Sequence, residues 1–444
     1  MLNVREETVL LPRPKTGEDL LAHFAREMKS RLGDSVAPTR FVVNETTADE
    51  YRCDIAVLEG GSDFPQHESI FDFRRRECLA DGDFNIVMIV PTGIGAEYGA
   101  HAGDATPAAR LLASTCDTLV THPNVVNASD INEMTPNTMY VEGSVINRLM
   151  MGTLGLQPSR GNRMIIISEN HPVQSVTDAA INSINGSRAA SGYNCTQYVK
   201  VNPPFEMHAS FTPDGRAAGK VIGIDRVFRV LEKYKGQYDA VAILSQIVFP
   251  KEQAMQYLKG DADSVNPWGG VEAMLTHAIS GMYHVPSAHA PMAQGTNGAL
   301  ASWGVGVVEP THAAEVVSTA YAHCVYKGLH TSPRLVRDRA QWAAPGVIDA
   351  SNISALVTPD RCIGLPTLAA LQQGIPVIAV RDKQNRMKND LTSLPWMPGQ
   401  LQFAESYCEA AGLLMAMRHG VSIDTVQRPL ERVRVDTWTD KTVL

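Results

Sequence analysis

The chain has 444 residues, enough for two domains that each bury a sizeable core. Hydrophobic residues make up 44% of the sequence and charged residues 19%, proportions that are typical of soluble globular proteins. The formal net charge of −8 argues against nucleic acid as the main partner. No apolar run reaches the roughly 18–20 residues that a membrane-spanning helix requires.

The N-terminal segment and the cysteines bear on the cellular compartment. The first residues are charged and lack the apolar core of a secretory signal. The seven cysteines are scattered and include no CxxC pair, so a disulfide framework is not expected. We therefore expect a cytoplasmic protein that acts on a small molecule, has neither nucleic acid nor a membrane as partner, and forms a homo-oligomer.

Residues 1–80 are expected to form an appended N-terminal region. Apolar residues at helical spacing predict a helix over 18–31, and a short apolar run predicts a strand over 40–43. The three consecutive arginines at 74–76 are typical of a solvated surface, with anion binding as the alternative.

The stretch 85–127 has the order strand, glycine-rich loop, helix, strand. Residues 86–90 are a β-branched run of strand length, a helix starts near Thr106 with Asp104 or Thr106 as its N-cap, and 118–120 form the next strand. This is one βαβ unit, in which a ligand usually lies at the carboxyl ends of the strands against the helix N-terminus. We therefore expect a functional site here.

Strands and helices continue to alternate along the rest of the chain. The expected strands are 139–143, 163–168, 194–201, 240–244, 354–358 and 376–380. The expected helices are 144–151, 175–184, 227–234, 271–280, 311–326, 366–373 and 403–419, and 284–291 is expected to be a polar loop. This alternation predicts an α/β fold with two doubly wound, Rossmann-like domains, mostly parallel sheets and a cleft between the domains. We place the first domain at 81–260, the second at 261–427, and a C-terminal tail that crosses to another domain or subunit, or frays, at 428–444.

The loop after the first strand is rich in glycine. Its spacing matches neither a dinucleotide-binding GxGxxG nor a Walker A loop, so no cofactor is assigned. Glycine allows close approach to the backbone, and the loop N–H groups would bind a carboxylate or another anion. The alternative is a tight turn that lets the helix pack on the strand. The predicted substrate-binding residues of this region are Thr92, Gly93, Gly95, Glu97 and Asn124.

Two histidines and an aspartate lie close to this loop. His101 and Asp104 are three residues apart, and His122 follows the next strand. We predict that His101 or His122 moves a proton, while Asp104 or Glu97 orients it or shares that role. A two-point metal site is the alternative, so the presence of a metal is left open.

A second group of candidates follows later strands. Cys362 precedes a helix N-terminus, where the partial positive charge lowers a thiol pKa and favours a nucleophile. The alternative is a small apolar residue packed under the loop. Thr367 in that helix and Arg386 after the next strand would hold an anionic group, and the loop residue His289 would contact the ligand.

Five segments carry a resemblance to other proteins. They are PTGIGAEYGAHAGDATPAARLLA at 91–113, DTLVTHPNVVNA at 117–128, MYVEG at 139–143, HAISGMYHVPSAHAP at 277–291 and GIPVIAVRDKQNRM at 374–387. Together they resemble a bacterial and plant family defined only as a domain of unknown function. The resemblance implies relatives of similar architecture and carries no activity. A shorter segment, ISALVTPDRCIGLPTLAALQQGIPVIAV, is similar to the C-terminal domain of nucleotide-sugar transferases and epimerases, in which a Gly-x-x-Thr step opens a phosphate-gripping helix.

These observations predict an enzyme that acts on a small polar metabolite bearing a carboxylate or phosphate, by acid–base and Cys nucleophilic chemistry. Isomerase, lyase and hydrolase reactions all fit. The alternatives are a nucleotide-sugar-dependent transferase or epimerase, and a non-catalytic metabolite sensor or assembly protein.

Overall fold

The computed structural model of the protein describes most of the chain. The described residues are 1–15, 17–33, 36–60, 64, 67–77, 82–99, 101, 103–127, 134–195, 197–260, 264–292, 306–316, 321–381 and 385–438.

Two parallel sheets form much of the interior. Within the described residues, one sheet has six strands in the order β19-β18-β16-β4-β5-β6, and the other has four in the order β14-β12-β8-β9. The strands of the first are β4 (Asn85–Met88), β5 (Thr118–Thr121), β6 (Thr138–Tyr140), β16 (Ile353–Pro359), β18 (Val377–Val380) and β19 (Leu401–Ala404). Those of the second are β8 (Met164–Glu169), β9 (Gln197–Val201), β12 (Ala240–Ser245) and β14 (Ser287–Pro291). The α/β class and the mostly parallel sheets are thus confirmed.

The strands are not divided between two consecutive domains. Strand β4 pairs with β5 on one side and with β16 on the other, so the six-stranded sheet joins the start of one predicted domain to the end of the other. The predicted arrangement of two doubly wound domains, with a boundary after residue 260, is therefore not confirmed. The local sequence pattern of a βαβ unit does not determine which distant strands pair with it, because that pairing depends on tertiary packing.

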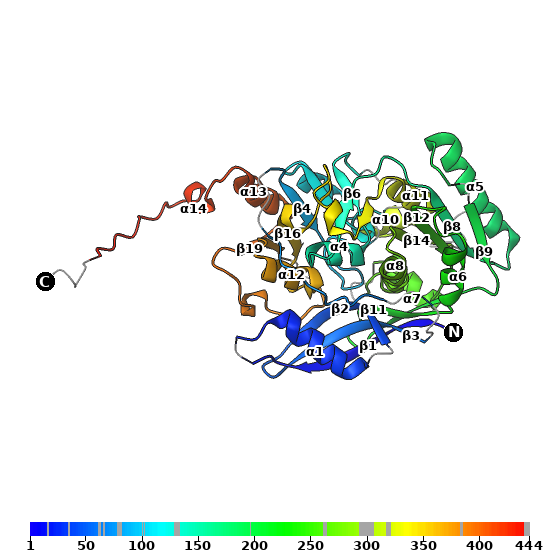
Figure 1. Cartoon of the computed structure of the whole chain (residues 1–444), viewed down its shortest axis with the longest axis horizontal. Helices are drawn as coiled ribbons and strands as arrows, with labels where there is room; N and C mark the ends of the chain where they lie inside the picture. The colour runs from blue at the N-terminus through cyan, green and yellow to red at the C-terminus, as the bar shows by residue number, and fades with distance from the viewer. Residues whose placement is uncertain are drawn as a thin grey trace.

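A third, mostly antiparallel sheet covers one side of the molecule (Figure 1). Its strands, in spatial order, are β13 (Ile247–Val248), β10 (Glu206–Phe211), β11 (Ala217–Ile222), β1 (Asn3–Pro12), β3 (Glu50–Glu59), β2 (Val36–Thr46) and β17 (Ile363–Gly364). The N-terminal region is therefore built into the fold, because β1 pairs with β11 and β2 with β17. Helix α1 (Leu20–Leu32) packs Phe24 and Met28 into the core beside Phe41 of this sheet.

The remaining elements connect and cover these sheets. A small two-stranded sheet pairs β7 (Gly155–Gln157) with β15 (Arg334–Val336). The helices are α2 (Thr106–Ala113), α3 (Pro123–Val126), α4 (Gly143–Met150), α5 (Gln174–Ser191), α6 (Asp225–Lys233), α7 (Lys251–Leu258), α8 (Gly269–Tyr283), α10 (Ala313–Val316), α11 (Tyr321–Thr331), α12 (Leu365–Gln373), α13 (Tyr407–Arg418) and α14 (Ile423–Val426).

Helix α8 is the central helix of the protein. The Asn266 side chain accepts hydrogen bonds from the N–H groups of Trp268 and Gly269 at its start, and His284 ends it in the left-handed conformation. It contacts β1, β2, β10 and β11 of the antiparallel sheet, β14 of the four-stranded sheet, and α4 (Figure 1). Because α8 is enclosed on most sides, polar side chains on it must find partners inside the protein.

Three predicted elements differ in the structure. Residues 284–291 are not a polar loop, because Ser287–Pro291 form β14 and pair in parallel with β12. The predicted helix 403–419 begins only at Tyr407, since Leu401–Ala404 pair with β18 and Ser406 caps the helix by accepting from Glu409 N. The predicted helix 311–326 falls in three elements, a 3-10 turn (Pro310–His312), α10 and α11. Residues 317–320 lie outside the part of the chain that the structure describes. In the first two cases tertiary pairing overrides the local preference.

The C-terminal segment after α14 extends away from the body of the protein (Figure 1). Val433, Val435 and Trp438 in this segment are almost fully exposed. Its crossing to another subunit, and the homo-oligomer, stay predictions.

Candidate functional site

The strongest polar cluster around α8 is centred on His277. Its Nε2 lies 3.1 Å from Glu142 Oε1, and its Nδ1 is buried without a hydrogen bond. Glu142 follows β6 and caps α4, since its Oε2 accepts from the backbone N–H of Ser144 (2.9 Å) and from the Ser144 hydroxyl. A carboxylate fixed in this way orients the imidazole and fixes which nitrogen faces it.

Opposing effects act on the pKa of His277. Burial lowers it, while the Glu142 carboxylate and the backbone of Thr39 favour the protonated ring, and Arg40 and Arg148 disfavour it. The net effect is a lowered pKa. The neutral imidazole is therefore favoured, which is the form that can accept a proton from a ligand as a general base.

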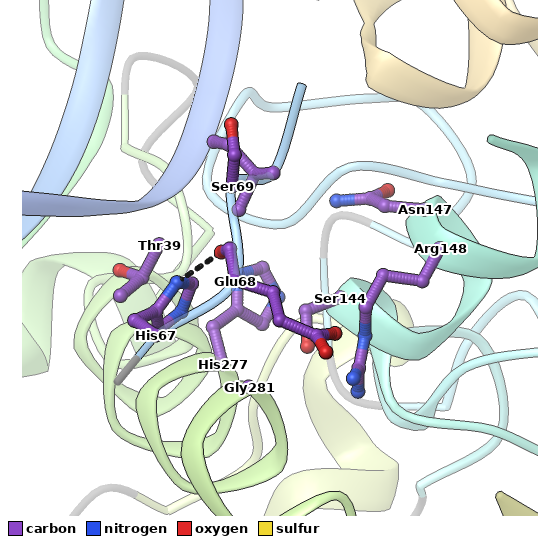
Figure 2. Close-up of a pocket in the computed structure, with 10 residues that line it drawn as sticks. Thr39, His67, Glu68, Ser69, Ser144, Asn147, Arg148, His277 and Gly281 are labelled. Atoms are coloured by element: carbon purple, nitrogen blue, oxygen red, sulfur yellow. Dashed lines mark hydrogen bonds between the residues drawn. The ribbon is translucent and has the colours of Figure 1, made fainter. Parts of the chain in front are cut away.

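A cavity reaches this histidine. It is small, and His277, Arg148 and Glu68 line it (Figure 2). The other lining residues are Thr39, His67, Ser69, Ile70, Ser144, Asn147 and Gly281. Most of these lining residues are polar, and they come from the antiparallel sheet, α4, α8 and the segment 67–70.

Arg148 supplies positive charge to this cavity. Its Nη2 donates to Ser280 O (3.0 Å) and its Nη1 lies 2.9 Å from His284 Nδ1, whereas its Nε is buried without a hydrogen bond. Burial lowers the pKa of Arg148 to about 10, so the guanidinium stays charged at neutral pH. The nearby Glu68 carboxylate is paired with Arg337. An anionic ligand could thus use the free Nε–H of Arg148.

The antiparallel sheet contributes a buried charged layer next to the same helix. Arg40 Nη1 donates to Glu6 Oε2 (3.1 Å), and Arg216 is paired with Asp54 and with Asp214. The second carboxylate oxygen of Glu6 is buried without a hydrogen bond, and burial raises the pKa of Glu6 to about 7. Clusters of buried ionisable groups with shifted pKa values are typical of functional sites, and structural ion-pair networks can also produce them.

Among the predicted residues, those near the glycine loop mainly hold that loop together. Asp104 Oδ1 accepts from Gly99 N (2.6 Å), and Asn124 Nδ2 donates to Val90 O and Gly99 O. The predicted capping role of Asp104 or Thr106 is wrong, because Ala105 is the N-cap of α2. Glu97 is exposed.

The predicted anion-binding positions pack closely against other elements. A side chain at Gly93 would lie 2.5 Å from Ala217 Cβ, and Gly93 O accepts from Ala217 N. Gly95 has a φ of +67° and faces Val265. The Thr92 hydroxyl is buried without a hydrogen bond beside Gly269, at the start of α8. The tight-turn alternative therefore accounts for both glycines, and their anion binding stays a prediction.

The two predicted catalytic histidines have different neighbours. His101 Nδ1 lies 2.7 Å from the Tyr257 hydroxyl, and its ring packs on His312 with centroids 3.8 Å apart. His122 Nε2 accepts from Val90 N (3.1 Å), and the charge of His277 acts on it. Only His122 thus belongs to the cluster on α8. Among the described residues, no three His, Cys, Asp or Glu side chains are arranged to hold a metal ion.

The residues of the second predicted group, which follow later strands, have different surroundings: some are packed in the core and one contacts the glycine loop. Cys362 is 3% exposed within the main hydrophobic core, and the Thr367 hydroxyl donates to its carbonyl (2.9 Å). Arg386 does meet the glycine loop, because its N–H donates to Ile94 O (2.9 Å). The predicted residues that follow β4 and those that follow β16 and β18 therefore lie close together, because these strands are neighbours in the six-stranded sheet. His289 lies in β14, bonded to Ser245 and Glu272.

Three residues of the cluster were not selected from the sequence. Glu142 lies at the carboxyl end of a predicted strand, so the reasoning that selected His122 could also have found it. His277 and Arg148 lie inside predicted helices, where nothing in the sequence separates a site residue from a packed one.

The burial of His122 has a consequence for the pH dependence of stability. Burial, together with the charge of His277, lowers the pKa of His122 from 6.5 to about 4. The unfolded chain therefore binds a proton that the folded protein rejects between these pH values. The folded protein is therefore not destabilised by His122 above pH 6.5. It loses stability as the pH falls from 6.5 towards 4.

We expect the variant His122→Gln, which keeps an acceptor for Val90 N–H, to remove this loss. The loss amounts to about 3 kcal/mol, since one pKa unit corresponds to about 1.4 kcal/mol. Urea denaturation at several pH values between 7 and 4.5 measures it, with the exposed His419→Gln as control. A variant curve that runs parallel to that of the wild type would contradict the prediction.

Comparisons with known proteins identify relatives of unknown activity. The model of the family described as "Protein of unknown function (DUF3326)" matches residues 85–427. An uncharacterized lipoprotein of Synechococcus sp. (strain ATCC 27144 / PCC 6301 / SAUG 1402/1) is 30% identical over 339 residues, covering 76% of this chain and 91% of that protein. No solved structure matches the chain. The predicted resemblance to a family of unknown function is thus confirmed.

The predicted cytoplasmic location is corrected by the same comparison. The Synechococcus relative is described as a lipoprotein, and a lipoprotein is held at a membrane by covalent lipid. Within the described part of the chain, no helix is long and apolar enough to cross a membrane. A search for apolar runs of membrane-spanning length detects spanning helices and does not detect attachment through covalent lipid.

Proposed function

The chain belongs to the DUF3326 family of unknown function, and we propose that it is an enzyme for acid–base chemistry on a small metabolite that bears a carboxylate or phosphate. The substrate would bind in the cavity beside α8, between the parallel sheets and the antiparallel sheet. The observation that supports this proposal most is His277, which pairs with Glu142 through one ring nitrogen and leaves the other without a hydrogen bond.

Each residue has a distinct role in this proposal. Arg148 would bind the anionic group through its free Nε–H, as a charge-assisted hydrogen bond. His277 would move the proton, and the Glu142 carboxylate would stabilise the imidazolium that forms when the ring accepts it. Proton transfer at a carbon next to the anionic group serves isomerases and lyases, so these two reaction classes fit the site best.

We expect small carboxylates or phosphates to raise the melting temperature of the wild-type protein in a saturable manner. The variant Arg148→Met should lose this response, because it removes the only proposed cation for the ligand. Arg334→Met, which alters an exposed arginine outside the cavity, is the matched control. Thermal unfolding against a panel of such anions measures the effect. Equal responses of wild type and Arg148→Met would contradict this role of the cavity.

A second measurement separates catalysis from binding. With any ligand found in this way, NMR in D₂O follows exchange of the carbon-bound proton, and His277→Gln should slow it by at least about 100-fold while the ligand still binds. Exchange that is absent in the wild type despite binding would favour the metabolite-sensor alternative. Exchange that persists unchanged in His277→Gln would refute the assignment of the base.

A further inference from the structure

A second polar arrangement lies at the carboxyl edge of the four-stranded sheet. Ser245 ends β12, and its Oγ lies 2.9 Å from Nε2 of His289 in the neighbouring strand β14. The other ring nitrogen of His289, Nδ1, lies 2.9 Å from Glu272 Oε1 in the first turn of α8. Hydroxyl, imidazole and carboxylate thus follow one another, with each ring nitrogen facing one partner.

This arrangement fixes the tautomer of His289. The Glu272 carboxylate can only accept, so Nδ1 carries the proton and Nε2 is free to accept the proton of the Ser245 hydroxyl. That order is the one found where a histidine activates a serine and a carboxylate orients the histidine. The Ser245 Oγ also lies 3.0 Å from Met207 Sδ, which is a weak partner.

The three side chains reach from the interior towards the surface. Ser245 is fully buried and the His289 side chain is 1% exposed, whereas the Glu272 side chain is 27% exposed. Gln246, directly after Ser245, is partly exposed. The N–H of Gln246 donates to Glu169 Oε1 (3.0 Å). An N–H of the residue after the nucleophile often stabilises the oxyanion in acyl transfer, and a substrate oxygen would replace Glu169 there.

We propose that Ser245, His289 and Glu272 form a second catalytic centre, which transfers acyl groups from small carboxylic esters to water. The Ser245 oxygen attacks the ester carbonyl while its proton passes to His289 Nε2. The carbon–oxygen bond to the alcohol then breaks, and the alcohol leaves with that proton. Water, deprotonated by His289, attacks the acyl-serine, which releases the carboxylic acid and restores the hydroxyl. Ser245 and His289 are the catalytic residues, and Glu272 is a positioning residue.

The test uses p-nitrophenyl acetate and the full chain. We expect hydrolysis above the uncatalysed rate, with an acetyl group on Ser245 after acid quenching, digestion and mass spectrometry. Ser245→Ala and His289→Gln should each lower the enzymatic rate by at least about 100-fold and abolish the acetyl-peptide. Glu272→Gln should still allow acetylation of Ser245 but lower kcat with KM unchanged, and Glu272→Asp should restore part of the rate, because a carboxylate again faces Nδ1 of His289.

The chain offers a matched control in a second buried serine. Ser287 also lies in β14, but its hydroxyl pairs with the Ser280 hydroxyl and with Thr276 O. Ser287→Ala should therefore leave hydrolysis unchanged. Thermal unfolding of each variant shows whether it is folded. The proposal is overturned if folded Ser245→Ala retains the wild-type rate, or if the wild type carries acetyl groups only on surface residues or on none. This outcome is independent of the acid–base site, whose readout is proton exchange at another ligand.

Discussion

Replacing Arg216 by Met is expected to lower the free energy of unfolding by about 3–5 kcal/mol, because the change leaves buried negative charge unpaired. The Arg216 side chain is 4% exposed and Asp54 is fully enclosed beside it. Its guanidinium donates to Asp54, and its Nε and Nη2 donate to the two carboxylate oxygens of Asp214 at 3.0 and 3.1 Å. Methionine preserves the volume of the stem but satisfies neither carboxylate.

Urea denaturation at pH 7 measures this loss, and two further variants test its cause. Arg229→Met removes an ion pair to Asp225 in which the arginine is 73% exposed, so it should change stability by less than about 0.5 kcal/mol. Adding Asp54→Asn to Arg216→Met should recover part of the loss, because the amide carries no charge. A double variant as unstable as the single one would show that lost packing, rather than unpaired charge, dominates.

Replacing Gly152 by Ala is expected to cost roughly 3–5 kcal/mol, for two separate reasons. Gly152 has a φ of +71°, a conformation that is unfavourable for alanine by about 1–2 kcal/mol. The added Cβ would also fall on the carbonyl oxygen of Arg74, a backbone atom that cannot rotate away. Thermal or chemical denaturation measures the total loss.

The carbonyl of Arg74 cannot move without breaking a larger set of contacts. It accepts from Gln373 Nε2 (2.8 Å), and Gln373 Oε1 accepts from Arg76 N (2.7 Å). Gly346→Ala is the matched control, because Gly346 has a φ of +81° and open space around it. It should cost only the conformational part, about 1–2 kcal/mol. Equal losses of unfolding free energy for Gly152→Ala and Gly346→Ala would contradict the prediction. They would show that the backbone at Arg74 moves away from the added Cβ without an energetic penalty.

The three arginines at 74–76 show what a charge pattern in the sequence can predict and what it cannot. A run of three arginines predicts a solvated surface, with anion binding as the alternative. Arg76 follows neither reading, because its guanidinium donates to the backbone carbonyls of Gln373, Gly374 and Ile353. It satisfies the free carbonyls at the C-terminal end of α12, which only the folded chain places within its reach.

The candidate sites show the same division between local pattern and tertiary contact. The strand, loop and helix order of 85–121 is local, so the sequence sufficed to predict β4, α2 and β5, and to select His122 at a strand end. It also sufficed to identify the family. The helix α8 was predicted as well, but its burial was not. It contributes His277 to one proposed centre and Glu272 to the other.

Sequence alone determined the α/β class, most helices and strands, and the family, because periodicity, turn residues and family motifs are local properties of the chain. Tertiary structure decided which polar groups became site candidates. The free nitrogen of His277 depends on Glu142, and the role of His289 depends on Ser245 and Glu272. These partners lie 17 to 135 residues apart. Helix α8 contributes His277 and Glu272, and the pairing of β12 with β14 places Ser245 beside His289.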